Sequence, residues 1–231
     1  MSLDIEAVAI GRDVYRVARG PDAFALPSWE YANTADGTFG GRYDDLLGEY
    51  RVLYVCVSRA GAFSETLAAL RPRIDVREAI EAIADGEADR SAAGIVPARW
   101  LEGRVAGDAR AAGLFADVGH SRTIGSLRAE LATAAAEVGL DDFDAATIRL
   151  SAPRRLTQLI SRLIYDESQA DGSPRFAGIA YGSRLGDELT NLAIFERPDS
   201  EPPMSGMRSA GIASDDADLA AALELLGLTL D

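Results

Sequence analysis

The sequence predicts a mixed α+β fold: one domain with a small, split, largely antiparallel sheet flanked by helices. Two observations favour it. Short apolar runs bounded by turn residues, at 52–57 and 192–195, are typical of buried strands. Leucine, isoleucine and alanine recur at helical spacing in 122–138 and 154–166. A chain of 231 residues is long enough to bury one sizeable core, so a single domain is the simplest expectation.

The first part of the chain predicts a strand, a glycine-rich loop, a second strand and a helix. The strand at 12–19 carries Tyr15 and Arg16, and a loop with Trp29 and Tyr31 follows over 21–37. Gly40 and Gly41 then lead to Arg42, just before the buried strand at 52–57. After a turn at Gly61, 62–70 is expected to be a short helix that Pro72 stops, with Glu65 in its first turn.

The middle of the chain, 74–150, is rich in alanine and is expected to be mainly helical. One helix is expected at 76–84 and another at 122–138, closed by Gly139. Between them, 95–97 predicts an edge strand and turn. His120 precedes the second helix, where a surface or capping role is the default and a functional role the alternative.

The last part predicts a helix at 154–166 and two strands at 176–181 and 192–195, which should pair antiparallel because they are close in sequence. Ser183 and Arg184 stand at the exit of the first of these strands. The expected domain covers 1–198. Prolines mark 199–231 as a linker followed by an amphipathic helix at 217–226, capped by 214–216 and packed on the same domain.

Composition excludes several classes of function. The net charge of −14 argues against a broad surface for nucleic acid or for an anionic membrane. All 23 basic residues are arginine, so a Walker A lysine or a Schiff-base lysine is excluded. His120 and Cys56 are the only residues of their kinds, which rules out a zinc site built from histidine and cysteine; no metal is expected.

Cys56 lies within an apolar run and is expected to be a small buried hydrophobe. A lone cysteine forms no internal disulfide, which fits a reducing compartment. The chain shows neither a signal peptide nor a stretch long enough to span a membrane, so a cytoplasmic location is expected.

Taken alone, Arg42 and Glu65 have an ordinary explanation. An arginine before a strand is usually solvated, and a glutamate in the first turn of a helix is favoured by the helix dipole. A functional interpretation therefore depends on other parts of the chain that match them.

Such a match runs through most of the chain. GRYD at 41–44, LYVCVSRAGAFSETLA at 53–68, LTQ at 156–158, GIAYGSR at 178–184 and LAIFE at 192–196 together resemble the RES family. That family is named for an arginine, a glutamate and a serine, which fall here on Arg42, Glu65 and Ser183. The resemblance covers about 15–196. The family pattern commonly has tryptophan or phenylalanine after the arginine, where this chain has Tyr43.

The resemblance implies an enzyme that consumes NAD+, with a fold like that of ADP-ribosyltransferases. Many members are toxins paired with a helix-turn-helix antitoxin, and some use inorganic phosphate to cleave NAD+. NAD+ is then a substrate, with phosphate as a candidate co-substrate and no permanently bound cofactor. Two alternatives stay open: transfer of ADP-ribose to a macromolecule, and an inactive RES-like module that acts through protein interactions.

The resemblance also implies a role for each of the candidate site residues. Breaking the nicotinamide–ribose bond passes through an oxocarbenium-like state, which the carboxylate of Glu65 would stabilise. Arg42 would hold the pyrophosphate as a planar fork. Ser183 would bind a phosphate or ribose oxygen. The expected substrate-binding residues beside Arg42 are Tyr54, which would stack on nicotinamide or pack in the core, and Tyr43, Tyr181 and Arg184.

Overall fold

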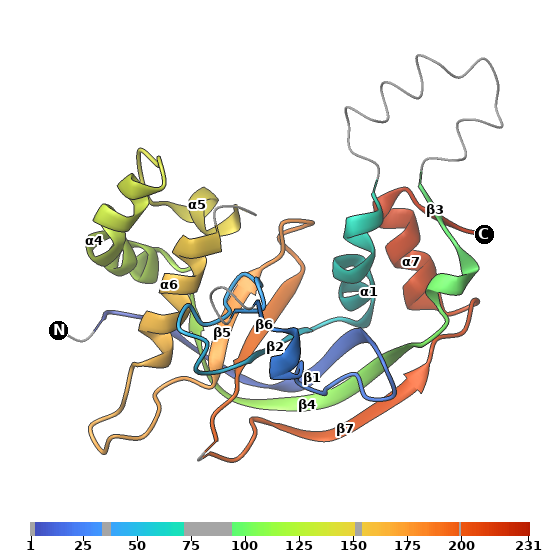
Figure 1. Ribbon diagram of the computed structural model, residues 1–231, viewed down its shortest axis with the longest axis horizontal. Coiled ribbons are helices and arrows are strands. Elements are labelled where there is room, and N and C mark those ends of the chain that lie inside the picture. Colours follow the sequence, from blue (N-terminus) through green and yellow to red (C-terminus); the bar gives the residue numbers. More distant parts are fainter. Residues whose placement is uncertain (1–2, 34–37, 72–93, 151–153, 199) are drawn as a thin grey trace.

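A computed structural model describes residues 3–33, 38–71, 94–150, 154–198 and 200–231 (Figure 1). Its strands are β1 (Ala7–Arg19), β2 (Val52–Cys56), β3 (Ile95–Val96), β4 (Arg104–Asp117), β5 (Gly178–Gly182), β6 (Thr190–Phe195), β7 (Met204–Gly211) and β8 (Thr229–Leu230). Its helices are α1 (Arg59–Leu67), α4 (Ser121–Glu137), α5 (Ala145–Arg149), α6 (Arg154–Tyr165) and α7 (Ala217–Leu226). The helix predicted at 76–84 lies outside the described residues.

The main sheet closes on itself. Its strand order is β1-β2-β6-β5-β4-β7, and β1 also pairs with β4, so that five strands of the described chain form a ring with β7 on its outer edge. Every pair except β4–β5 is antiparallel, including the predicted pairing of β5 with β6. The prediction of a mixed fold with a largely antiparallel sheet is confirmed, but the prediction of a small, split sheet is wrong.

The closing strand is β4, in a region predicted to be mainly helical. It pairs with β1 along its whole length, from Arg104 opposite Arg19 to Ala116 opposite Ala7. Its alanines favour a helix in isolation, but long-range pairing overrides local propensity. Ala109 and Ala111 are buried inside the ring, where small side chains fit between strands.

The predicted linker is also partly wrong, because β7 follows its prolines at once and pairs with β4 from Met204 to Gly211. The predicted helix beyond it is present. Asp216 caps α7, Gly227 ends it at φ +64°, and Arg59 of α1 forms ion pairs with Asp216 and Asp218.

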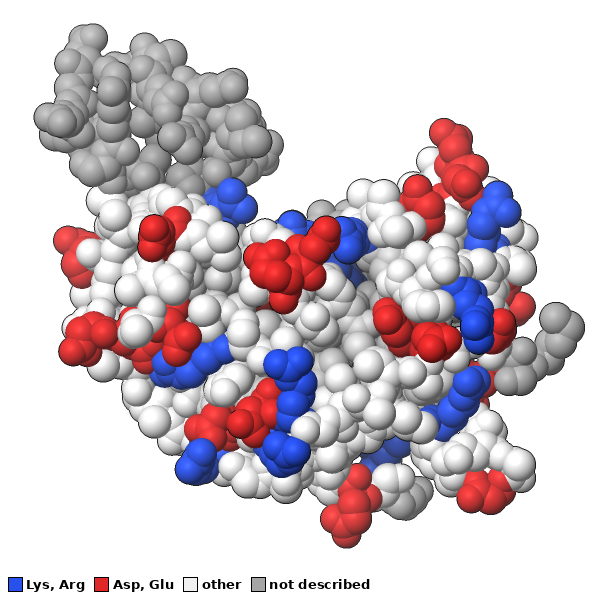
Figure 2. Space-filling view, turned by 180° about the vertical axis from the view of Figure 1, so that it is seen from behind, with Lys and Arg blue, Asp and Glu red and all other residues white. Residues whose placement is uncertain are grey.

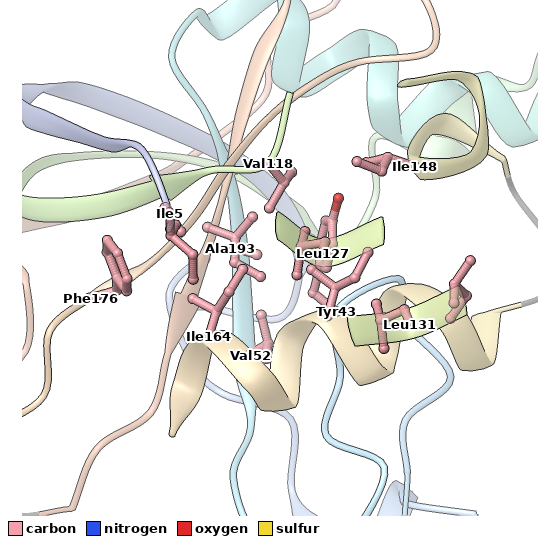
Figure 3. Close-up of a cluster of buried hydrophobic side chains, with 14 of the residues drawn as sticks. Ile5, Tyr43, Val52, Val118, Leu127, Leu131, Ile148, Ile164, Phe176 and Ala193 are labelled. Atoms are coloured by element: carbon pink, nitrogen blue, oxygen red, sulfur yellow. The ribbon is translucent and has the colours of Figure 1, made fainter. Parts of the chain in front are cut away.

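Three apolar clusters hold these elements together. One fills the inside of the ring, with Val14, Leu53, Phe115 and Leu192 among its members. A second packs α4 and α6 against the outside of β2, β5 and β6 (Figure 3). A third packs α1 and α7 against the other end of the sheet. The described helices therefore form two separate groups, α4–α6 over one end of the sheet's outer face and α1 with α7 over the other end (Figure 1).

Two helix starts bear on the sequence predictions. His120 is the N-cap of α4, where its Nδ1 accepts a hydrogen bond from the backbone N–H of Arg122, so the default capping role is confirmed. Helix α1 begins at Arg59, capped by the hydroxyl of Ser58. Glu65 therefore lies in the second turn, and its predicted place in the first turn is wrong. Among the described residues, no helix combines the length and apolar character that crossing a membrane requires.

Candidate active site

A cleft of about 380 Å³ lies on the outer face of the sheet, between α1 and the N-terminus of α6. Its floor is made by β1, β2, β6 and β5, and its walls carry Glu65 of α1, Arg154 of α6 and Arg42 of the loop before β2. Five of the predicted site residues line it: Arg42, Tyr54, Glu65, Tyr181 and Arg184.

One row of paired residues forms the floor. Tyr15 pairs with Cys56, Cys56 with Asn191, and Asn191 with Tyr181. Side chains of directly paired residues project to the same face of a sheet, so these four side chains face the cleft together. Cys56 is buried, as predicted, and burial raises the pKa of its thiol.

The loop that carries Arg42 is held from below by Tyr54 and Asp44. The hydroxyl of Tyr54 donates to Asp44 Oδ1 (2.7 Å) and accepts from the backbone N–H of Tyr43 (2.9 Å). The backbone N–H of Gly41 donates to Asp44 Oδ2. A Cβ at Gly41 would lie 2.6 Å from that carboxylate and 2.7 Å from the Tyr54 hydroxyl, so a larger residue would displace these groups and disturb their hydrogen bonds.

Arg42 is thus the half-buried end of an ordered turn. Its Nη2 donates to the carbonyl of Arg149 (3.3 Å), and its guanidinium carbon lies 5.6 Å from the centre of the Tyr181 ring. Burial raises the pKa of Asp44, while the hydrogen bonds from Tyr54 and Gly41 oppose that rise. The Tyr54 hydroxyl stays protonated for the same reason, because burial raises its pKa well above the ordinary value.

Removing the Tyr54 hydroxyl should loosen this turn. Tyr54→Phe leaves Asp44 Oδ1 and the Tyr43 N–H without their partner, and we expect a loss of about 1–3 kcal/mol in the free energy of unfolding. Urea denaturation measures it. Tyr31→Phe is the matched control, since Tyr31 is 75% exposed, and it should stay within about 0.5 kcal/mol of wild type. Equal stability of the two variants would contradict the assigned network.

Glu65 reaches the cleft from the opposite wall. Its side chain is exposed to solvent, and its Oε1 accepts a hydrogen bond from Asn191 Nδ2 (2.6 Å) on the floor. The second carboxylate oxygen is therefore the one available to a bound ligand.

Of the described residues, four arginines line the cleft: Arg16, Arg42, Arg154 and Arg184. Arg16 donates to the carbonyls of Ala23 and Ala25, which fixes the loop after β1. None of these four arginines forms an ion pair within the described residues. Many of the arginines elsewhere in the described chain do pair with a nearby carboxylate. Figure 2 shows the same pattern on one face of the molecule, where basic side chains lie mostly beside acidic ones.

Two predicted residues lie beneath the cleft and do not line it. Ser183 is 2% exposed, and its hydroxyl accepts from the backbone N–H of Leu185 (2.9 Å), which shapes the turn that presents Arg184. Tyr43 is fully buried in the cluster of Figure 3 and packs edge-on against Tyr181, with ring centres 4.9 Å apart. Burial raises the pKa of the Tyr43 hydroxyl, and the nearby charge of Arg42 opposes that rise.

Two residues of the cleft lining, Arg154 and Asn191, are not among the predicted site residues. Both left a signal. Two arginines, Arg154 and Arg155, open α6, where the helix dipole disfavours positive charge. Asn191 directly precedes the four apolar residues that complete its strand, although asparagine is depleted in strands. Within the described part of the chain, no three histidine, cysteine, aspartate or glutamate side chains gather as a metal site would require.

Comparison with known proteins gives a match to a solved structure and none to a family model or a curated protein. No protein-family model matches the chain, and no curated protein matches it. Among solved structures, the chain is similar to one from the crystal structure of the M. tuberculosis MbcT–MbcA toxin–antitoxin complex, with 13% identity and a TM-score of 0.47. The match covers 96% of this chain and 92% of that one. Similarity at this level assigns neither a family nor an activity.

Proposed function

We propose that the chain is an enzyme of the RES type that cleaves NAD+ at the nicotinamide–ribose bond. The observation that carries the proposal is the composition of one cleft. A fixed carboxylate, Glu65, stands on one wall. The other walls carry Arg42, Arg154 and Arg184, which form no ion pair within the part of the chain that the structure describes. The volume of about 380 Å³ lies within the range of small-molecule sites.

The arginines favour an anionic ligand. In a chain of net charge −14, a cleft lined by several cations concentrates anions locally. A pyrophosphate offers oxygens in the geometry that a guanidinium binds with two parallel hydrogen bonds. Arg42 is the best placed for this role, because Tyr54 and Asp44 order its turn.

Glu65 supplies the chemistry. As the bond between ribose C1′ and the nicotinamide nitrogen breaks, its electron pair leaves with nicotinamide and positive charge develops on the ribose. A carboxylate already in place stabilises that charge without reorganisation. An acceptor oxygen then bonds to C1′. A water oxygen loses a proton to solvent as the bond forms, whereas an anionic oxygen of inorganic phosphate has no proton to lose. Nicotinamide departs neutral, so no general acid is needed.

The remaining roles combine the sequence resemblance with the position of each residue. The rings of Tyr54 and Tyr181 are the candidates to stack on nicotinamide or ribose, and Ser183 acts through the turn that carries Arg184. The resemblance also implies a cytoplasmic toxin with a helix-turn-helix antitoxin as protein partner. NAD+ is a substrate in this proposal and is not a resident cofactor.

Expression in a bacterial host tests the function in cells. We expect cellular NAD+ to fall and growth to stop, and Arg42→Ala to relieve both. Arg155→Ala is the matched control, because Arg155 is exposed on α6 and does not line the cleft; it should remain as harmful as wild type. Growth arrest at normal NAD+ would contradict the proposal, and labelled ADP-ribose on host proteins would favour a transferase.

A further inference from the structure

We propose that Asn191 is the positioning residue for Glu65, and that its amide is kept in the sheet to aim that carboxylate into the cleft. The inference rests on the proposed function. Asn191 is not one of the RES motif residues, which are Arg42, Glu65 and Ser183.

The fold does not need an asparagine at this place in β6. Asn191 is 3% exposed in β6, and the residues that follow it, Leu192 to Phe195, are all apolar and buried. A buried amide costs free energy unless it is hydrogen-bonded, and asparagine is a poor strand former. An apolar residue of similar size would serve the sheet better.

The amide of Asn191 has a charged hydrogen-bond partner in Glu65. Asn191 Nδ2 donates to Glu65 Oε1 at 2.6 Å, across 126 positions of sequence and from the floor of the cleft to its wall. An ionised carboxylate only accepts hydrogen bonds, so the amide must present its NH2 group to Glu65. The charged acceptor makes this bond stronger than one between neutral groups.

This hydrogen bond restrains the Glu65 side chain. Glu65 projects into solvent from α1, and an exposed glutamate samples several rotamers. Tying Oε1 to a rigid strand fixes the plane of the carboxylate and leaves Oε2 for the substrate. Preorganised charge of this kind is what stabilises a transition state.

Two variants test the assignment by nicotinamide release. Asn191→Leu keeps the size and removes the donor, and we expect kcat to fall about 10- to 100-fold with KM for NAD+ nearly unchanged. Thr190→Val, on the same strand but outside the cleft lining, is the matched control and should keep the wild-type kcat. Circular dichroism and urea denaturation show whether each variant is folded.

Asn191→Asp gives a readout that a purely structural role would not. Two carboxyl groups that share a site raise the pKa of one of them. Below that pKa, the protonated carboxyl introduced by the substitution donates to Glu65 and the pair carries the wild-type charge; above it the two carboxylates repel. Activity relative to wild type should therefore recover about tenfold between about pH 8 and about pH 5.5. Asn191→Leu should show no such recovery.

Among the described residues that line the cleft with the pair, the other titratable side chains are Tyr15 of β1, Cys56 of β2 and Tyr181 of β5, and the charged ones are Arg16, Arg42, Arg154 and Arg184. Burial raises the pKa of Cys56 and of Tyr181, so neither loses a proton over this range. Wild-type kcat in Asn191→Leu, or an Asn191→Asp profile that parallels wild type, would overturn the positioning role alone. A folded wild-type chain that releases no nicotinamide would overturn the proposed function, and the positioning role with it.

Discussion

Glu65→Gln is expected to lower kcat for nicotinamide release by about 10²- to 10³-fold, the size of effect seen when one preorganised electrostatic group is lost from an active site. Glutamine keeps the shape of the side chain and its carbonyl oxygen still accepts from Asn191, so the geometry of the cleft should survive. NAD+ binding, measured by calorimetry, should change little, because the lost interaction acts in the transition state.

The control for Glu65→Gln is Glu137→Gln, which makes the same chemical change on an exposed residue of α4, away from the cleft. It should keep the wild-type kcat. Retained turnover in a folded Glu65→Gln protein would remove Glu65 from the mechanism.

Arg42→Lys should raise KM for NAD+ by about 10- to 100-fold, with kcat largely kept. Lysine preserves the charge, but its ammonium is a point charge that lacks the planar pair of donors matching a pyrophosphate. An interaction made equally in the ground state and in the transition state affects binding and not the chemical step. Steady-state kinetics separates the two constants.

Arg155→Lys is the matched control, since it makes the same exchange on an exposed arginine of α6 and should leave both constants unchanged. A fall in kcat with an unchanged KM in Arg42→Lys would place Arg42 against the ribose or the acceptor. Wild-type values for both constants would mean that Arg42 has no part in binding.

Much of the site could be predicted because its residues lie in short, ordered motifs. Arg42 sits behind two glycines, and Glu65 follows the short turn between β2 and α1, so sequence spacing already places both beside the strand. The sequence predicts Tyr54 and Tyr181 on strands, and the pairing of those strands through β6 brings both to the cleft.

The parts that were missed depend on contacts far apart in sequence. The strand β4 is alanine-rich and becomes a strand only because β1 offers a partner along its whole length. Asn191 donates its hydrogen bond to a carboxylate 126 positions away in the sequence. Arg154 reaches the cleft only because α6 packs across the outer face of the sheet. No pattern within a short stretch of sequence indicates contacts between residues so far apart in the chain.

The burial of Ser183 and Tyr43 also depends on how the chain folds around them. Ser183 follows β5 directly, which predicts a place at the strand's end, but the closed turn to Leu189 folds its hydroxyl inward. Tyr43 is next to Arg42 in sequence and points the opposite way, into the cluster under α6. Their predicted roles in contact with substrate stay predictions.

The most direct measurement is the fate of NAD+ incubated with the purified wild-type chain, followed by liquid chromatography and mass spectrometry with and without inorganic phosphate. The account predicts that NAD+ disappears and that nicotinamide appears mole for mole, together with free or phosphorylated ADP-ribose. Intact NAD+ after incubation with the folded chain under both conditions would contradict it.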